Sequence, residues 1–489
     1  MSGTVALPVW IVAVLVLAAA LAVVDRLLIP SVRWFIRRRA NVVIEEIGRR
    51  LHLEMRPFAL TKREVLVDRL MYDPRILEAA GSRAREDGTP RDVVMARVER
   101  YAREIVPAFN AYAYFRIGYW LARNAARVLY RVRVAVADAA GLAAVDPKSS
   151  VVFVMNHRSN MDYVLVAYLA ATRTALSYAV GEWARIWPLQ TLVRSLGAYF
   201  IRRDSKDPLY RLVLERYVAM ATEGGVVQAV FPEGGLTRDG ALRPPKFGLL
   251  DYMTRSFDPG GERDIVFIPV GINYDRTLED RSQLLALAKD APKRSLAFAA
   301  TTALKFIARN LVLMARGRWY RFGYACVNFG SPVSMKAYCR ERGFDFRTLD
   351  RDDRFRRVEA LAGRLLDAVG RVIPVLPVSL VATAFLDFGK QRAGLLDLKA
   401  EVHGLIRSLR ERGAHVHVPR GDEDYAVEVG LRMLSLRRLV ADEGGLYVAR
   451  PEEVPLLRYY ANSIRHLLPA PPSRHRPERG PDLHAPATS

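Results

Sequence analysis

The alternation of short apolar strands with helical segments through about residue 332 constrains the fold of this chain more than any other feature. An apolar run at 151–155 is typical of a buried strand, and the run at 163–170 is typical of a buried helix. Further strands are predicted to end at Arg202 and Arg203 and to cover 226–231 and 265–270. Strands that alternate with helices in this way predict an α/β layer fold rather than an all-helical or all-β one.

The polar turn between the first of these strands and its helix contains His157 and Asp162. His157 is the only histidine between His52 and His403, so imidazole chemistry in the middle of the chain depends on it. Residues five apart are separated by about 140° around a regular helix, so the pair meets only if His157 lies in the loop and Asp162 in the first helical turn. The carboxylate would then bind one ring nitrogen and leave the other as a general base.

Taken alone, such a pair is more often structural, with a histidine that caps a loop and an acid at the N-terminus of a helix. No serine stands in a G-x-S-x-G nucleophile elbow. A reactive histidine would therefore favour direct attack by a substrate hydroxyl over an acyl-enzyme.

Basic residues gather in polar loops near the predicted strand ends, together with a pair of glycines. The cations are Arg202, Arg203, Lys206 and Lys246. Guanidinium groups bind a phosphate monoester in a bidentate manner, and a lysine serves as a point charge. Gly234 and Gly235 would let the backbone approach a ligand closely. An arginine pair by itself more often marks a solvated face or a helix cap, but the combination favours a phosphate site.

In their order and spacing, four sequence blocks resemble the membrane glycerol-3-phosphate acyltransferases, a family that carries H-x4-D, G-x-F-I-R-R, E-G-G-x-S/T-R and a strand ending in I-P. The corresponding segments here are 157–162, 197–203, 233–238 and 265–269. Segment 327–332 is similar to the strand that closes this fold, and 457–464 is similar to a C-terminal segment of the glycerol-3-phosphate branch.

The chain departs from the family pattern at Leu236, where the family usually has an arginine, and Thr237 stands in for the usual serine. The sequence Phe-Pro-Glu-Gly at 231–234 also resembles the sister branch that acylates lysophosphatidic acid. Arg202, Arg203 and the segment 459–462 favour the glycerol-3-phosphate branch.

The resemblance implies a glycerolipid acyltransferase-type α/β catalytic domain, which transfers a fatty acyl group from acyl-CoA or acyl carrier protein to the sn-1 hydroxyl of glycerol 3-phosphate. The product would be lysophosphatidic acid for phospholipid biosynthesis. His157 would take the hydroxyl proton, Asp162 would orient it, and backbone N–H groups near Gly234 and Gly235 would stabilise the oxyanion. The residues implied to bind substrate or shape its pocket are Arg158, Ser159, Arg202, Arg203, Lys206, Glu233, Gly234, Gly235, Arg238, Lys246 and Pro269. No metal and no cofactor beyond the acyl thioester co-substrate is implied.

The formal net charge of +22 implies an anionic partner, which could be nucleic acid, an anionic lipid surface or a phosphate-bearing substrate. Zinc-ligand spacing, an RNP-like aromatic strand and a clear recognition helix are missing, so no nucleic-acid partner is expected. Two cysteines exclude a disulfide framework and fit a reducing compartment. Two alternatives stay open: acylation of 1-acylglycerol 3-phosphate or dihydroxyacetone phosphate, and a basic membrane-anchored scaffold that binds anionic lipid without catalysis.

Residues 5–24 form an apolar run without a charge, interrupted only by Pro8. Twenty residues at ~1.5 Å each span ~30 Å, enough to cross a bilayer. A cleaved signal peptide or an interfacial segment is the alternative. Because no Lys or Arg precedes the run and several arginines follow it, the positive-inside rule predicts an anchor in the cell (inner) membrane with the catalytic domain facing the cytoplasm.

The predicted domain organisation has five parts. They are an N-terminal transmembrane anchor at 1–30, a helical region at 31–145, the α/β acyltransferase domain at 146–335, a helical C-terminal domain at 336–467 and a disordered tail at 468–489. Within the helical region, 113–134 mixes aromatic residues with arginines, which fits an interfacial helix and ordinary packing about equally. The apolar segment 372–386 is too short and proline-interrupted for a second span and predicts a core helix or pocket cover.

Overall fold

The computed structural model describes residues 61–109, 114, 118–170, 176–180, 189–195, 197–202, 205–287, 321–388 and 392–469. The predicted anchor at 1–30, Arg203 and nearly all of the predicted tail lie outside the described residues. Within the described ranges, no helix has both the length and the apolar composition needed to cross a bilayer.

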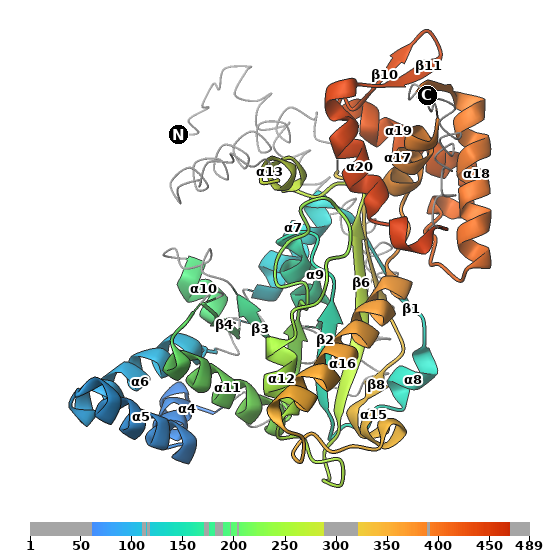
Figure 1. The fold of residues 1–489 in the computed structure, drawn as a ribbon. Helices are drawn as coiled ribbons and strands as arrows, with labels where there is room; N and C mark the ends of the chain where they lie inside the picture. The colour runs from blue at the N-terminus through green and yellow to red at the C-terminus, as the bar shows by residue number, and fades with distance from the viewer. Residues whose placement is uncertain are drawn as a thin grey trace, which may run out of the picture.

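A mixed sheet of eight strands lies at the centre of the described chain (Figure 1), in the order β1-β7-β6-β2-β5-β3-β4 with β8 beside β6. The strands are β1 (Arg131–Val136), β2 (Ser150–Met155), β3 (Ser177–Val180), β4 (Ala198–Phe200), β5 (Gln228–Val230), β6 (Ile265–Tyr274), β7 (Tyr324–Phe329) and β8 (Val333–Ser334). Strands β2 to β6 run parallel, whereas β7 and β8 run antiparallel to β6. The predicted α/β fold is confirmed.

Helices cover both faces of this sheet, which explains why every residue of β2, β6 and β7 is buried. On one face the core includes α11 (Pro208–Glu223), α12 (Gly248–Thr254) and α16 (Arg351–Val372). On the other it includes α7 (Tyr119–Leu129) and α9 (Met161–Ala170). Figure 1 shows α16 crossing in front of the sheet and α7 and α9 behind it.

The segment 113–134 does not form one interfacial helix. Helix α7 ends at Leu129, Tyr130 takes an extended backbone conformation, and β1 begins at Arg131. The period-two alternation of Val132 and Val134 with arginines places apolar side chains on the sheet face, and this strand period overrides the helical pattern before it. The sheet therefore includes a strand from the region that the sequence predicted to be helical.

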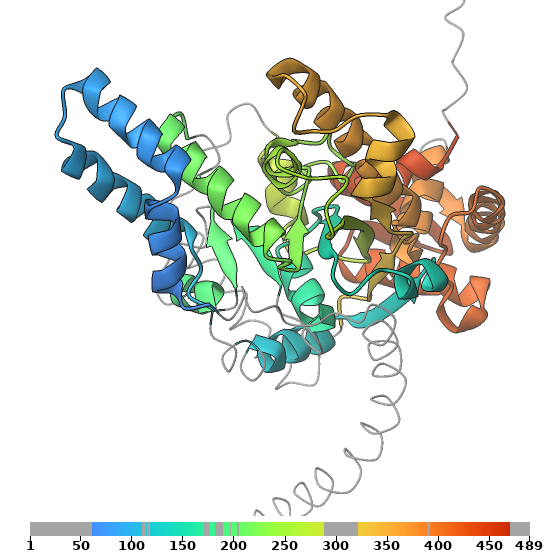
Figure 2. The same cartoon turned by 90° about the horizontal axis from the view of Figure 1, so that it is seen from below.

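Three helices, α4 (Arg63–Met71), α5 (Pro74–Asp87) and α6 (Arg91–Ile105), pack against α11 at the β4 end of the molecule (Figures 1 and 2). Asp73 caps α5 by accepting hydrogen bonds from the backbone N–H groups of Arg75 and Ile76. The same carboxylate binds Arg216 of α11 at 2.8 Å, so the cap also fixes the helices to each other.

The C-terminal unit is built around α17 (Pro377–Asp387), which contacts α18 (Leu395–Glu411), α19 (Glu423–Leu436) and α20 (Val454–Asn462). Residues 377–385 are all buried, so the apolar segment predicted as a core helix lies at the centre of this unit. A small antiparallel sheet, β9 (Arg392–Gly394), β10 (Val440–Glu443) and β11 (Leu446–Ala449), adds strands to a region that the sequence predicted to be helical.

Candidate active site

The candidate site lies where the carboxyl ends of the parallel strands meet. The loops that follow β2, β5 and β6 come together there, which is where α/β proteins bind ligands. The turn after β2 is fixed to β6 by Asn156, whose side-chain amide donates to the Ile272 carbonyl at 2.8 Å and accepts from its N–H at 2.8 Å. The next residue, His157, therefore has a defined position.

His157 and Asp162 are in contact, with 2.9 Å between Nδ1 and Oδ2. Asp162 is in the first turn of α9, as the spacing argument required, and Oδ2 also accepts from the backbone N–H groups of Arg158 and Ser159 at 2.7 and 3.0 Å. His157 is 3% exposed and Asp162 0%. Because the carboxylate is an acceptor, Nδ1 carries the hydrogen and Nε2 carries the lone pair that a base needs.

The hydroxyl of Tyr274 donates to the second oxygen of Asp162 at 2.6 Å. Burial, followed by the charge of Asp162, raises the pKa of Tyr274 well above its ordinary value, so it stays a donor. The sequence did not identify this residue, because the strand was predicted to end at residue 270 whereas β6 continues to Tyr274. Apolar residues continue past Pro269 in the sequence, and this continuation was the signal that could have extended the predicted strand to Tyr274.

Two aromatic rings hold the imidazole in place. The Phe231 ring lies 4.2 Å from the His157 ring, centroid to centroid, at 32°, and the Tyr163 ring lies at 5.3 Å and 83°. Phe231 follows β5 and Tyr163 lies in α9, so both walls come from elements that the strand and helix patterns predict. These contacts fix the plane of the ring before any substrate arrives.

Glu233 joins the two loops beside His157. One carboxylate oxygen accepts from the His157 N–H at 2.8 Å and the other from the Arg243 N–H at 3.0 Å. The side chain is 2% exposed, and burial raises its pKa to about 7. Its contacts are thus to protein backbone, where the family resemblance implied a substrate contact.

The glycine pair brings Lys246 to the site. Gly234 has a φ of +67°, and a Cβ there would lie 2.7 Å from Cδ of Lys246, so the lysine stem runs across the glycine. The Gly234 N–H donates to the Phe231 carbonyl at 3.0 Å. That N–H therefore already has a partner, and the expectation that backbone N–H groups near Gly234 and Gly235 stabilise an oxyanion stays a prediction. Gly235, the next residue in the chain, is buried.

Three cations lie on the loop that follows the glycine pair. Thr237 N–H donates to the His157 carbonyl at 3.0 Å, which fixes this loop to the turn. Arg238 and Lys246 are exposed, and Arg243 donates through Nη1 to the Leu236 carbonyl at 3.3 Å. Among the described residues, none of these three cations forms an ion pair with a carboxylate. The sequence singled out two of them and did not assign Arg243.

Arg158 is buried and connects this loop to the C-terminal unit. Its Nη1 donates to the Gly240 carbonyl, and its guanidinium lies 4.9 Å from the Tyr459 ring centroid. Its Nε and Nη2 have no hydrogen-bond partner among the described residues. Asn462 donates to the Asp239 carbonyl at 3.0 Å, so α20 is held directly against the loop.

Ser159 donates through its hydroxyl to Glu279 at 2.7 Å, and the same carboxylate accepts from the Asn160 N–H at 3.1 Å. Glu279 follows β6 and is 120 residues away in sequence, so no local pattern indicated it. The turn is thereby closed by two carboxylates, Glu233 on one side and Glu279 on the other.

The remaining predicted residues are not linked to His157. Arg202 makes a two-pronged contact with Glu104, at 2.9 and 2.6 Å, and its guanidinium lies 5.2 and 5.0 Å from the ring centroids of Tyr101 and Tyr210. Lys206 is exposed, and Arg203 is outside the described residues. Pro269 lies inside β6, between the residues that pair with β8 and those that pair with β7. The sheet therefore needs no hydrogen bond from the N–H group that proline lacks.

The fold and the His157–Asp162 contact fit the pattern of the H-x4-D acyltransferases, and two family models match the chain. A model described as "Acyltransferase" matches residues 136–273, and one described as "Glycerol-3-phosphate acyltransferase C-terminal region" matches 309–472. The resemblance to the glycerol-3-phosphate acyltransferases that the four sequence blocks carry is confirmed by these matches and by the curated relatives.

Curated relatives carry the same family name. A glycerol-3-phosphate acyltransferase of Xylella fastidiosa (strain M23) is 26% identical over 426 residues, which are 84% of this chain and 48% of the relative. One of Pseudomonas putida is 28% identical over 429 residues, covering 84% and 50%. The chain thus spans about half the length of the curated relatives it matches. A crystal structure of the 1-acyl-sn-glycerophosphate (LPA) acyltransferase of Thermotoga maritima is 16% identical with a TM-score of 0.30, over 52% of this chain and 78% of that one.

Proposed function

We propose that this protein transfers a fatty acyl group from an acyl thioester to the sn-1 hydroxyl of glycerol 3-phosphate and so forms lysophosphatidic acid. The observation that carries the proposal is the buried His157–Asp162 pair, at 2.9 Å, on a turn that is bonded to a loop with three cations free of carboxylate partners within the described residues. A general base on the turn and a set of cations on the loop bonded to it suit an acceptor that carries both a hydroxyl and a phosphate. The family name of the curated relatives supports the same acceptor.

The proposed mechanism follows from the orientation of the imidazole. Nε2 of His157 takes the hydroxyl proton while the oxygen attacks the thioester carbonyl, and Asp162 stabilises the imidazolium that results. The tetrahedral intermediate then collapses, the ester C–O bond remains, the C–S bond breaks, and the imidazolium returns its proton to the thiolate. No covalent acyl-enzyme is needed.

The phosphate of the acceptor is proposed to bind to Arg238, Arg243 and Lys246. Arg243 stands in for the arginine that the family usually places at Leu236, since its guanidinium reaches the Leu236 carbonyl at 3.3 Å. A guanidinium and an ammonium on one loop provide both bidentate and point-charge contacts to a phosphate. Arg202 is a weaker candidate than the sequence suggested, because Glu104 already neutralises it.

Several features outside the site complete the proposal. We propose that residues 5–24 anchor the protein in the inner membrane with its catalytic part in the cytoplasm. We also propose that the catalytic domain extends beyond the predicted limits of 146–335, because β1 belongs to its sheet and α16 packs on that sheet. The donor is acyl-CoA or acyl carrier protein. Both are anionic, and the net charge of +22 attracts either.

A second acceptor class is favoured by one observation, the leucine at 236 together with the Phe-Pro-Glu-Gly sequence of the lysophosphatidic acid branch. Acyl transfer by the purified full-length chain in detergent, with each acceptor and each donor supplied separately, distinguishes the two. We expect glycerol 3-phosphate to give the higher kcat/KM. Preferential acylation of 1-acylglycerol 3-phosphate would assign the protein to the other branch, and preference for dihydroxyacetone phosphate would also contradict the proposal.

A further inference from the structure

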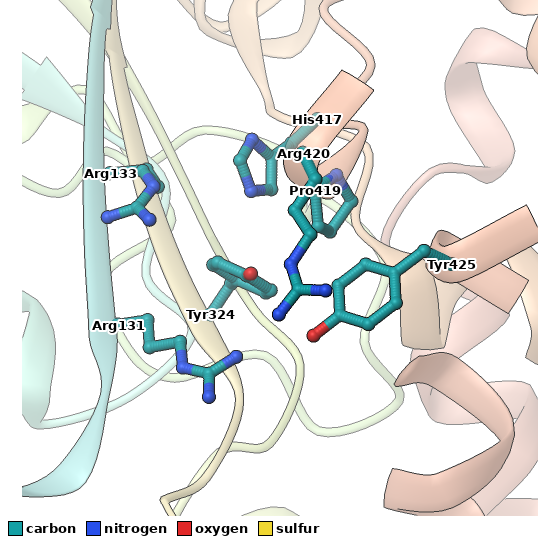
Figure 3. A pocket seen from close by; sticks show the side chains of 7 residues that line it. All are labelled: Arg131, Arg133, Tyr324, His417, Pro419, Arg420 and Tyr425. Atoms are coloured by element: carbon teal, nitrogen blue, oxygen red, sulfur yellow. The ribbon is translucent and has the colours of Figure 1, made fainter. Parts of the chain in front are cut away.

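A second basic cavity, of about 410 Å³, lies between the edge of the main sheet and the C-terminal unit (Figure 3). Arg131 and Arg133 of β1 form one wall, and Arg420 and Tyr425 form the opposite one, with the ring of Tyr324 between them. The cavity thus combines residues that are far apart in the sequence.

This cavity and the His157 site are on opposite faces of the sheet. Arg131 pairs in register with Tyr324, so their side chains project to the same face. Tyr274, which donates to Asp162, pairs with Ala325, one residue further along β7, and therefore projects to the other face. A ligand in the cavity would not touch the proposed base.

Among the described residues, no carboxylate lines the cavity to balance the three guanidinium groups. Within the same ranges, none of the three arginines forms an ion pair. Asp275 accepts from the backbone N–H groups of Tyr324 and Val378 at 2.8 and 3.1 Å and does not line the cavity. Burial raises its pKa to about 7, although these hydrogen bonds and the charge of Arg131 act to lower it. Like charges repel strongly in a partly desolvated space, so an anion would stabilise this arrangement.

His417 and the backbone of Arg420 add two further observations on this cavity. His417 Nε2 is buried and has no hydrogen bond within the described residues, and its ring lies 4.6 Å from the Tyr324 ring. Arg420 has a φ of 62°, which non-glycine residues adopt rarely, and its guanidinium lies 4.1 Å from the Tyr425 ring centroid. Burial, and then the charge of Arg133, lowers the pKa of His417 to about 4, so at neutral pH the ring is neutral.

We propose that this cavity is a second anion site, which binds a small organic phosphate through residues that lie outside the His157 site. Guanidinium forks match phosphate oxygens, and His417 Nε2 adds a hydrogen-bonding group. The volume exceeds that of a single phosphate and falls within the usual range for small-molecule sites, and the tyrosine and histidine rings offer stacking surfaces for the organic part.

Two sources carry this chemistry, namely the phosphorylated nucleotide end of a coenzyme A thioester and a free phosphorylated metabolite. Calorimetric titration of the full chain in detergent with adenosine 3′,5′-bisphosphate, with glycerol 3-phosphate and with inorganic phosphate distinguishes them. Glycerol 3-phosphate is also the proposed acceptor, so only binding that the cavity variants weaken reports on this cavity.

We expect at least one of the two organic probes to bind, and Arg133→Gln and Arg420→Gln each to weaken it by about 10-fold or more, the value of one charge-assisted contact. Arg340→Gln, which removes an exposed charge from α15 (Met335–Arg342), is the matched control and should leave the affinity within about 2-fold. Arg420→Gly relieves the left-handed backbone and should keep or raise Tm while it weakens the probe, which separates binding from folding.

Binding of the nucleotide alone, with a raised donor KM in the cavity variants, identifies the donor as the source. Binding of glycerol 3-phosphate that the cavity variants weaken, at unchanged acceptor KM, identifies a free metabolite. The proposal is overturned if neither organic probe binds, if both cavity variants bind like Arg340→Gln, or if inorganic phosphate binds as tightly as the organic probes.

Discussion

Asp162 is the residue on which the geometry of the candidate site depends. Its two oxygens accept hydrogen bonds from the His157 ring, from two backbone N–H groups of the turn and from the Tyr274 hydroxyl. The turn supplies three of these donors within five residues, whereas Tyr274 is 112 residues away. The position of the imidazole is therefore set jointly by a local turn and by the far end of β6.

Replacement of Tyr274 by phenylalanine tests this long-range contact. It leaves Oδ1 of a fully buried carboxylate without its donor, so we expect the free energy of unfolding to fall by ~1–3 kcal/mol and kcat to fall roughly 10-fold. Tyr130→Phe is the control, since that hydroxyl is also buried but donates to the Arg276 carbonyl. Denaturant unfolding and steady-state rates measure both effects, and equal losses of kcat in the two variants would show that the Asp162 contact has no special role.

Glu233 predicts a pH dependence of stability. Burial raises its pKa to about 7, above the usual value near 4.5, so the folded state holds a proton that the unfolded state has already lost between those two values. The contribution of Glu233 to stability should therefore fall as pH rises from about 4.5 to about 7. Glu233→Gln cannot ionise, and its free energy of unfolding should change less over this range. Parallel curves for the two proteins would contradict the assignment.

At the scale of elements, the sequence predicts the structures that depend on residues close together in the chain. The strand at 151–155, the turn and the helix at 163–170 are contiguous, so hydrophobic periodicity and one spacing argument place His157 beside Asp162. Contacts such as Tyr274–Asp162, Glu279–Ser159 and Tyr459–Arg158 depend on how separate elements pack, and no periodicity carries that information. The pairing of Arg202 with Glu104 was hidden for the same reason, because α6 docks beside β4 only in the folded chain.

Helix α20 closes over the loop that follows the glycine pair, and Gly240 is where they touch. A Cβ at Gly240 would lie 1.9 Å from the Tyr459 carbonyl oxygen, and its φ is +88°. Gly240→Ala should push α20 away from the loop, lower Tm and raise the acceptor KM.

Gly343→Ala is the matched control for this prediction. It also has a positive φ, +67°, but nothing lies within 4 Å of its Cβ, so only the backbone cost of ~1–2 kcal/mol is expected there. If Gly240→Ala costs no more than Gly343→Ala and leaves the acceptor KM unchanged, the contact between α20 and the loop does not support the site.

At the scale of the whole molecule, the main sheet and the C-terminal unit act together. Helix α20 contacts both the turn that follows β2 and the loop that follows the glycine pair. The second cavity also lies between the main sheet and the C-terminal unit. The proposed anchor adds the membrane to this arrangement. Deletion of residues 1–24 should release the protein from a carbonate-resistant membrane fraction but leave part of it bound through basic residues, at roughly 1 kcal/mol for each Lys or Arg near an anionic surface. Salt should weaken that residual binding. A shortened protein that still resists carbonate extraction would show that residues 5–24 are not the anchor.

The central claim is that His157 is the base for acyl transfer to glycerol 3-phosphate. The most direct measurement is kcat of purified His157→Ala beside His403→Ala, which replaces a half-buried histidine that pairs with Asp424 in the C-terminal unit. With both variants folded by near-UV circular dichroism, the account predicts a loss of about 10²–10⁴-fold for His157→Ala and an unchanged rate for His403→Ala. A folded His157→Ala protein that turns over at the wild-type rate would contradict it.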